Sequence, residues 1–407
     1  MSNSIIDNSI NWITGSDVRI KDPTSQFNGA FYSSYDSRKH LYHLLYCEII
    51  GYAIKFLLNL YTREKNKKYL DMALSSGQFL LKSQNNEVNS PFHGAFLYGY
   101  DRKSFKKIGA YFSFDTGIII SSLVDLYKET ADIQYLNSAK RAGEWLVNSM
   151  QNEDGSFKAV LFDNNFVNID NRLRNFIGSI NKSCLHAKNA IGLIKLSEAS
   201  HIEYFKTSAI RTLYWSLKLQ NSDGGFRITE NNNFIFTHYH CYCLEGLLYG
   251  YFKLRNNLFL ESSIKGAEWL LKSQNEDASL FKSYGFRPGI YVDNEIRYKI
   301  AKLFLRPRDV GVTAQAIRIW LILFKYTNNS EFKNVAERAI RFVESMQNKS
   351  RKNCNSSGAF HFNCFKLPGF TMRSAHLSTW TTMFACRALQ LASERDIVET
   401  TFFNDFF

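Results

Sequence analysis

Histidines recur at one kind of position in this sequence, and they are its first candidates for chemistry. Most of them lie in long linkers ahead of apolar helical segments, or in the first turns of those segments: His40, His43, His93, His186, His238, His240, His361 and His376. Histidine is the side chain best suited to proton transfer near neutral pH. We therefore expect catalytic histidines among them, and we select His186, His238 and His376, which occupy similar places two residues into three segments.

His238 and His240 compete for one role, because both fall in the start of the same helical segment. Residues two apart point about 200° apart around an α-helix, so both cannot face the same centre. We predict that His238, nearer the helix start, faces inward as a catalytic residue. His240 is retained as a candidate for substrate binding.

Carboxylates near the starts of three segments are the second group of candidates. Glu48 stands among apolar neighbours in YHLLYCEIIGY, and a buried carboxylate needs a partner or a function. Asp115 and Asp309 suit helix capping as well as chemistry. We predict Glu48 and Asp115 as catalytic residues on the floor of a pocket and Asp309 as a substrate-binding residue, and Glu245 raises the same question.

Positive charge concentrates in the same linkers. The chain carries a formal net charge of +13, and the segment RYKIAKLFLRPR (297–308) is basic without an acid. Arginine clamps carboxylate or phosphate groups, which predicts an anionic ligand bound by Arg306 and Arg308. The alternative is a solvated basic rim. Tyr52 and Tyr100 are candidates for substrate binding and for the proton donor.

Several kinds of site are absent from the sequence. It lacks a nucleophile elbow, a phosphate loop, a dinucleotide fingerprint, a His-Glu-x-x-His motif and an EF-hand, and it has no nucleic-acid-binding motif. The seven cysteines follow no framework spacing, so we expect no cofactor and no metal site, in a reduced cytoplasmic protein. The sequence has no run of about 18 apolar residues, so we expect no membrane span. The oligomeric state is left open.

A repeated pattern indicates the elements that position these residues. Five copies open on an aromatic residue and close about four helical turns later on Gln-Asn, with a second ring five or six residues before the glutamine. The five glutamines are Gln84, Gln151, Gln220, Gln274 and Gln347. Self-similarity at long period is typical of a repeat architecture. The segment around Trp12 reads as a sixth, degenerate copy.

A second set of helical patterns alternates with these repeats. They are apolar on more than one face, which is typical of buried helices, and cover roughly 40–61, 114–129, 183–198, 237–254, 309–326 and 374–391. Six buried helices inside six amphipathic ones predict an all-α fold, a closed (α/α)6 toroid forming a single domain over residues 1–407. The links from outer to inner helices are long, and loops of this length are usually functional. We therefore expect the site on the face where the inner helices begin.

Two known groups of proteins share stretches with this chain. KRAGEWLVNSMQNEDGSF (140–157) resembles the Gln-Trp repeat of terpene cyclases, which are also α/α toroids, but their Asp-x-Asp-Asp motif is absent. A fuller resemblance is to the VpsJ-type polysaccharide biosynthesis proteins of bacterial surface-glycan gene clusters. It rests on YCEIIGYAI (46–54), FDTGIIISSLVDLY (114–127), DGSF (154–157), HYHCYCLEGLLYGY (238–251) and GVTAQAIRIWLILF (311–324).

The resemblance departs around Glu48. Where those proteins have Tyr-Pro-Glu-x-Thr-Gly-Tyr, this chain keeps Glu48, Gly51 and Tyr52 but lacks the Pro and the Thr. The resemblance implies a role in surface-polysaccharide synthesis, and it implies no particular reaction. The same toroid also carries glycoside hydrolases, uronate lyases and sugar epimerases, among which the fold alone does not choose.

Three functions remain open at this point. The first is a carbohydrate-active enzyme that abstracts a proton from an anionic, uronate-type sugar, as epimerases and lyases do. The second is a glycoside hydrolase with paired carboxylates, Asp115 with Glu48 or Asp309. The third is a non-catalytic glycan-binding or scaffold protein, and terpene cyclase chemistry is disfavoured.

Overall fold

The computed structural model describes residues 3–163, 165, 181–231, 233–285, 306–350, 353–367 and 369–394. Residues 297–305, which hold most of the basic segment singled out above, lie outside the described residues. None of the helices in these ranges has the length and apolar character needed to cross a bilayer.

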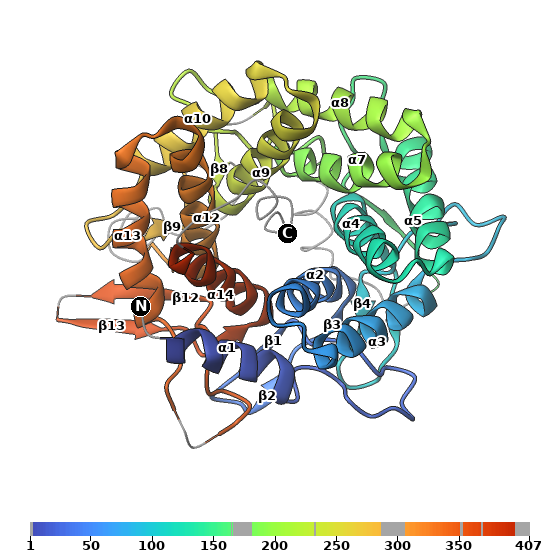
Figure 1. The fold of residues 1–407 in the computed structure, drawn as a ribbon, viewed down its shortest axis with the longest axis horizontal. Coiled ribbons are helices and arrows are strands. Elements are labelled where there is room, and N and C mark those ends of the chain that lie inside the picture. The colour runs from blue at the N-terminus through green and yellow to red at the C-terminus, as the bar shows by residue number, and fades with distance from the viewer. Residues whose placement is uncertain are drawn as a thin grey trace, which may run out of the picture.

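Two concentric rings of helices form the described part of the chain (Figure 1). The inner ring consists of α2 (Cys47–Glu64), α4 (Ser113–Thr130), α7 (Asn189–Ser200), α9 (Thr237–Leu254), α12 (Val310–Thr327) and α14 (Thr379–Ser393), with a 3-10 helix, η2 (Cys184–Lys188), before α7. The outer ring consists of α1 (Asn3–Gly15), α3 (Lys67–Ser83), α5 (Ile133–Trp145), α8 (Glu203–Leu217), α10 (Asn257–Lys272) and α13 (Ser330–Ser345), with a π-helical turn, η1 (Leu146–Met150), after α5. The fold is the predicted (α/α)6 toroid.

The predicted sixth outer helix is α1, which contains Trp12 with 1% of its surface exposed. The inner segments are apolar on more than one face because they are buried, as predicted. Helix α4, for example, is buried continuously from Ser113 to Val124. A helix that is buried on all sides belongs to the middle of a structure.

The repeated glutamines join neighbouring outer helices. Gln84 follows α3 and donates from Nε2 to the carbonyl of Ser138 in α5, at 2.9 Å. Gln347 follows α13 and donates to the carbonyl of Ile5 in α1, at 2.7 Å. The last outer helix is thereby fastened to the first, and the Gln-Asn repeat is explained as part of the scaffold.

Glycines after the repeat allow the close approach that these bonds require. Gly155, in the DGSF stretch, has φ of 90°, a conformation that L side chains rarely adopt. A Cβ on Gly155 would lie 2.6 Å from the carbonyl oxygen of Arg211 in α8. The link after α5 can therefore pack directly on α8.

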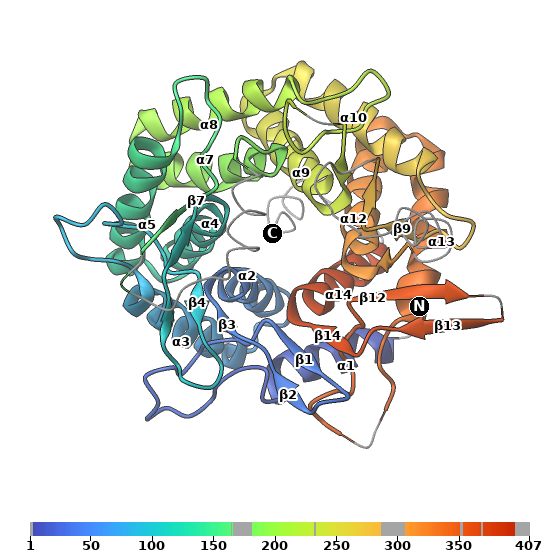
Figure 2. The ribbon, with the colours of Figure 1, turned by 180° about the vertical axis from the view of Figure 1, so that it is seen from behind.

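Short strands occupy the long links, on the face that Figure 2 presents. They are β1 (Ser34–Asp36), β2 (Leu41–Tyr42), β3 (Leu45–Tyr46), β4 (Gly99–Tyr100), β5 (Lys107–Ile108), β6 (Ala110–Phe112), β7 (Val160–Phe162), β8 (Ile235–Phe236), β9 (Leu280–Phe281), β10 (Ser283–Tyr284), β11 (Arg308–Asp309), β12 (Asn363–Leu367), β13 (Phe370–Arg373) and β14 (His376–Ser378). The largest sheet among the described residues has the order β13-β12-β11-β9. These strands brace the loops around the starts of the inner helices.

Two inner helices begin later than predicted. Helix α2 starts at Cys47, whereas the sequence pattern began at residue 40, and α14 starts at Thr379, whereas the pattern began at residue 374. The intervening residues pair as strands, with β1 between β14 and β2. Inter-strand hydrogen bonds take up the backbone groups that we assigned to helix.

Candidate active site

A cavity of about 370 Å³ is lined by residues from the starts of the inner helices and from the long links. Each inner segment contributes to it through its first turn or the residues just before: Ser33, Tyr46, Glu48, Ile49, Tyr98, Phe112, Phe114, Asp115, Leu185, His238, Tyr239, Tyr242, Asp309, Phe362, Ser378 and Trp380. The lining within the described residues therefore combines aromatic rings with three carboxyl groups and one imidazole.

Glu48 and Asp115 come from adjacent inner helices and share a tyrosine. The hydroxyl of Tyr46 donates to Oδ1 of Asp115 at 3.3 Å, and it lies near enough to Glu48 to lower the pKa of that carboxyl group. The second oxygen of Asp115, Oδ2, is buried without a hydrogen-bond partner in the described part of the chain. A buried oxygen in this state is suited to meet a ligand in the cavity.

Burial favours the protonated form of both carboxyl groups. It raises the pKa of Glu48 to about 7, against the opposing effects of the Tyr46 hydroxyl and of Lys188. Burial, followed by the charge of Glu48, raises the pKa of Asp115 well above its usual range. Near neutral pH the pair therefore holds a proton, which is the condition for a general acid.

The opposite wall carries His238 and Asp309. His238 is enclosed by the rings of Phe236, Tyr239 and Tyr242, with centroids 4.7, 4.4 and 5.8 Å away. Burial, and then the charge of Lys282, lowers the pKa of His238 to about 3, so the imidazole is neutral. Asp309 caps α12 by accepting from the amide of Val312 at 3.0 Å. Burial raises the pKa of Asp309 to about 6.

The order of the ring sets these groups across from one another. Helix α2 stands opposite α9, and α4 stands opposite α12 (Figure 1). Glu48 therefore faces the side of His238, and Asp115 faces the side of Asp309. A ligand in the cavity would lie between two walls that can each exchange protons.

Aromatic side chains form much of the remaining lining. Tyr46 and Tyr98 pack with ring centroids 4.6 Å apart, and Phe114 and Tyr242 with centroids 4.8 Å apart. Trp380 enters from the first turn of α14. Apolar faces beside a few polar groups are the usual composition of a small-molecule site.

A buried ionic cluster lies among the inner helices behind this lining. Lys188 Nζ is 2.6 Å from Glu245, and Arg318 is 3.2 Å from the same carboxylate. The Lys188 ammonium also lies 4.4 Å from the ring centroid of Tyr242, which lines the cavity. The charge of Lys188 lowers the pKa of Glu48, so the ionic cluster affects the protonation of a residue that lines the cavity.

Three predicted residues pack into the scaffold instead of the cavity lining. His240 accepts from the amide of Phe226 at 3.0 Å, contacts the Gly266 carbonyl and packs against Trp269. His186 is buried in η2 beside Phe157. Tyr52 is buried behind the lining, close to Glu48 and Tyr242. The expectation that His186 shares a cavity with His238 is not met, because the 3-10 turn leaves the imidazole buried.

Four other predicted residues lie on the loop face away from the cavity lining. His376 is exposed on β14, because the chain is still extended there. Tyr100 shares a hydrogen bond with Ser83 and lines a different depression. Arg308 pairs with Asp277 at 3.2 Å, and Arg306 lies over the ring of Phe281. The described lining contains no lysine or arginine, so Arg306 and Arg308 lie outside it.

Several residues of the site were not predicted as site residues. Tyr46 and Trp380 were overlooked because aromatic residues are common in this sequence and suit core packing equally well. Lys188, which lies behind the lining, was not predicted as a site residue either. Its position beside an apolar helical pattern was the available signal, since a lysine buried there needs a carboxylate.

Comparison with known proteins extends the fold assignment. No family model matches the sequence, and no curated protein is significantly similar to it. Among solved structures, a sugar epimerase from a ruminal bacterium has a TM-score of 0.72 at 13% identity, over 97% of this chain and 98% of that one. Cellobiose 2-epimerase from Bacillus thermoamylovorans has a TM-score of 0.70 at 14% identity, over 95% and 98% of the two chains.

Unsaturated glucuronyl hydrolase from Streptococcus agalactiae is also similar, with a TM-score of 0.65 at 14% identity, over 97% of this chain and 92% of that one. Sequence identities this low establish a common fold and leave the reaction open. The chain is thus an (α/α)6 toroid whose architecture is shared nearly end to end with sugar epimerases and glucuronyl hydrolases.

Proposed function

We propose that this chain is a carbohydrate-active enzyme that transfers protons to and from a saccharide held in the central cavity, in the manner of an epimerase or lyase. One observation carries the proposal. Glu48 and His238 line one cavity from opposite helices of the inner ring. Near neutral pH the Glu48 carboxyl group exchanges between its protonated and ionised forms, whereas the His238 imidazole is neutral. The likeness of the fold to sugar epimerases supports the class of substrate.

The two groups have complementary roles in this proposal. One removes a proton from a carbon beside a carbonyl or carboxyl group, and the other returns a proton to the opposite face of that carbon. Glu48, with a pKa of about 7, is present in both forms at working pH, which suits general acid–base catalysis. The neutral imidazole of His238 can accept a proton at one nitrogen while it donates from the other.

The substrate that these walls favour is a sugar ring stacked between aromatic faces. A uronate-type substrate and a role in surface-polysaccharide synthesis remain part of the proposal. They rest on the net charge of the chain and on its resemblance to the VpsJ-type proteins. Arg308 and Lys188 are held in ion pairs, and the described lining contains no lysine or arginine that could bind a substrate carboxylate. Neutral sugars therefore belong in the same test.

Isotope exchange tests the proposal. The protein is incubated in heavy water with a panel of neutral and uronate-containing oligosaccharides, and deuterium on carbon is measured by NMR and mass spectrometry. We expect exchange at one ring or chain carbon of at least one sugar. Protein that binds a sugar of the panel without exchanging any carbon-bound proton would contradict it.

Glycoside hydrolysis is the second candidate, and the shared tyrosine favours it. The Tyr46 hydroxyl bonds to Asp115 and lies near Glu48, so the two carboxyl groups are neighbours, as the paired carboxylates of glycosidases are. Release of reducing ends without deuterium on carbon would select this reaction. Binding without either product would select the non-catalytic glycan-binding protein.

A further inference from the structure

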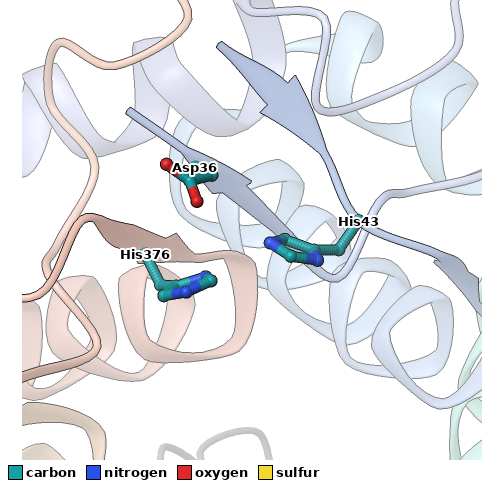
Figure 3. A group of neighbouring side chains, drawn as sticks. All are labelled: Asp36, His43 and His376. Atoms are coloured by element: carbon teal, nitrogen blue, oxygen red, sulfur yellow. The ribbon is translucent and has the colours of Figure 1, made fainter. Parts of the chain in front are cut away.

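Asp36, His43 and His376 converge at the loop face of the toroid (Figure 3). Each offers one possible ligand atom, a carboxylate oxygen or a ring nitrogen, and these three atoms lie within 4.8 Å of one another. None of the three lines the central cavity. The cluster is therefore separate from the proposed catalytic groups.

A three-stranded sheet fixes this arrangement. Asp36 ends β1 and stands directly opposite His376 of β14 in the strand register. His43 follows β2, and its amide donates to the carbonyl of Ser34 in β1 at 2.9 Å. The three side chains thus start from neighbouring strands of one sheet.

Two of the side chains are prepared for a further partner. The Nε2 atom of His43 is buried and has no hydrogen-bond partner among the described residues, a state that is rare for a buried polar atom. Asp36 accepts the amides of Arg38 and Lys39, both at 2.9 Å and both at Oδ1. These bonds fix the carboxylate and leave its Oδ2 atom for another contact.

We propose that Asp36, His43 and His376 bind one divalent transition-metal ion of the zinc class. Two imidazoles and a carboxylate are a donor set that such ions use, with the remaining position open to water or another ligand. Bonds of about 2.0–2.1 Å to tetrahedral zinc require donor atoms about 3.4 Å apart. From separations of at most 4.8 Å, the cluster reaches this spacing by a contraction of up to about 1.4 Å, which the exposed side chain of His376 can accommodate.

The local charge indicates what fills the open position. One carboxylate leaves a bound dication with a net positive charge, and Lys39 and Arg102 lie near enough to His43 to add to it. The open position therefore favours an anionic ligand such as hydroxide or a carboxylate.

The site would act as a clasp between the two ends of the ring. His43 precedes the first inner helix, whereas His376 precedes the last one. An ion that links segments so distant in sequence closes a long loop and stabilises the folded state by its binding free energy. Ser33, just before β1, and Ser378, at the end of β14, line the central cavity, so the clasp also holds one side of its mouth.

Metal binding to the intact protein tests the proposal. The chain is prepared without a histidine tag and in a Cys354→Ser background, because Cys354 is an exposed free thiol that could bind zinc by itself. It is freed of metal with a chelator, dialysed and titrated with Zn²⁺ by calorimetry. The melting temperature is followed with and without the ion. Circular dichroism verifies that each variant is folded.

We expect one Zn²⁺ per chain and a rise in melting temperature on binding. His43→Ala, His376→Ala and Asp36→Asn should each weaken binding at least tenfold and remove that rise. Asp36→Asn retains an acceptor for the two turn amides, so it separates loss of the ligand from loss of the turn. The matched control is His201→Asn, since His201 is exposed, has φ of 59° and lies in the C-cap of α7, where asparagine is tolerated.

Two results would overturn the proposal. One is the absence of stoichiometric Zn²⁺ binding to the folded Cys354→Ser protein. The other is binding that the three ligand variants leave as strong as in the His201→Asn control. Either result is independent of sugar turnover, so it bears on the clasp alone.

Discussion

The hydroxyl of Tyr46 lies 3.3 Å from Oδ1 of Asp115 and joins the first turns of two neighbouring inner helices. The same hydroxyl also lowers the pKa of Glu48. One phenol thus stabilises the ionised forms of two buried carboxyl groups and opposes the effect of their burial. The acid strength of the proposed catalytic pair depends on this contact.

Replacement of Tyr46 by phenylalanine should shift the pH dependence of turnover. Loss of the hydrogen bond raises the pKa of Glu48 further above about 7 and that of Asp115 with it. If protonated Glu48 is the acid, the alkaline limb of kcat/KM moves to higher pH. The pH profile of Tyr46→Phe is compared with that of Tyr135→Phe in the outer helix α5, where no shift is expected. An alkaline limb in the same place in both variants would show that Tyr46 does not tune the acid.

Glu48→Gln should stabilise the protein at alkaline pH. Glu48 binds its proton more tightly in the folded chain, with a pKa of about 7 against 4.5 for the free group. The stability that this proton contributes is complete below pH 4.5 and is lost as pH rises through about 7. At pH 8 the ionised carboxylate costs about 3 kcal/mol.

Melting curves at pH 5 and pH 8 measure this effect. Glu48→Gln should melt above the wild type at pH 8, and the difference should shrink at pH 5. A variant that melts below the wild type at pH 8 would mean that the charge of Glu48 is well compensated in the folded chain.

Gln347→Ala should loosen the closure of the outer ring. The side-chain amide of Gln347 donates to the carbonyl of Ile5 and to the hydroxyl of Ser9, at 2.7 and 2.9 Å. Its removal leaves buried acceptors unpaired, at a cost of about 1–3 kcal/mol. Urea unfolding measures the loss, with the exposed Gln134→Ala as control. Equal stability of the two variants would remove the closing role of the glutamine.

Trp145→Ala and Trp269→Ala should each destabilise the toroid by about 3–5 kcal/mol, as large truncations in a core do. Their exposed fractions are 3% and 7%, and Trp145 Nε1 also donates to the Pro91 carbonyl. Thermal melts give the effect, with Val88→Ala, which is 79% exposed, as control. Melting temperatures unchanged by both tryptophan variants would show that the aromatic side chains of the repeat do not stabilise the packing between helical hairpins.

The architecture could be predicted because the sequence repeats one helical pattern. Each Gln-ended segment recurs at long period, and the packing of Trp145 and Trp269 is a local property of each copy. Even the degenerate copy around Trp12 retained its ring. The starts of α2 and α14 could not be predicted, because strand pairing between β1 and β14 joins residues at opposite ends of the chain.

Cavity positions could be predicted only where helix geometry decides them. Glu48, Asp115, His238 and Asp309 line the cavity because they stand at the starts of inner helices. His240 faces Trp269 because it is two residues further along a regular helix. The partners of Arg308 and Lys188 are distant in sequence, so their ion pairs with Asp277 and Glu245 gave no sequence signal.

Isotope exchange by matched variants tests the central claim most directly. The rate of deuterium incorporation into the sugar that the wild type exchanges fastest is measured for Glu48→Gln, His238→Asn and the His201→Asn control, while calorimetry follows sugar binding. The account predicts that both cavity variants lose exchange at least a hundredfold and still bind the sugar, whereas the control exchanges at the wild-type rate. Exchange that survives in both Glu48→Gln and His238→Asn would contradict it.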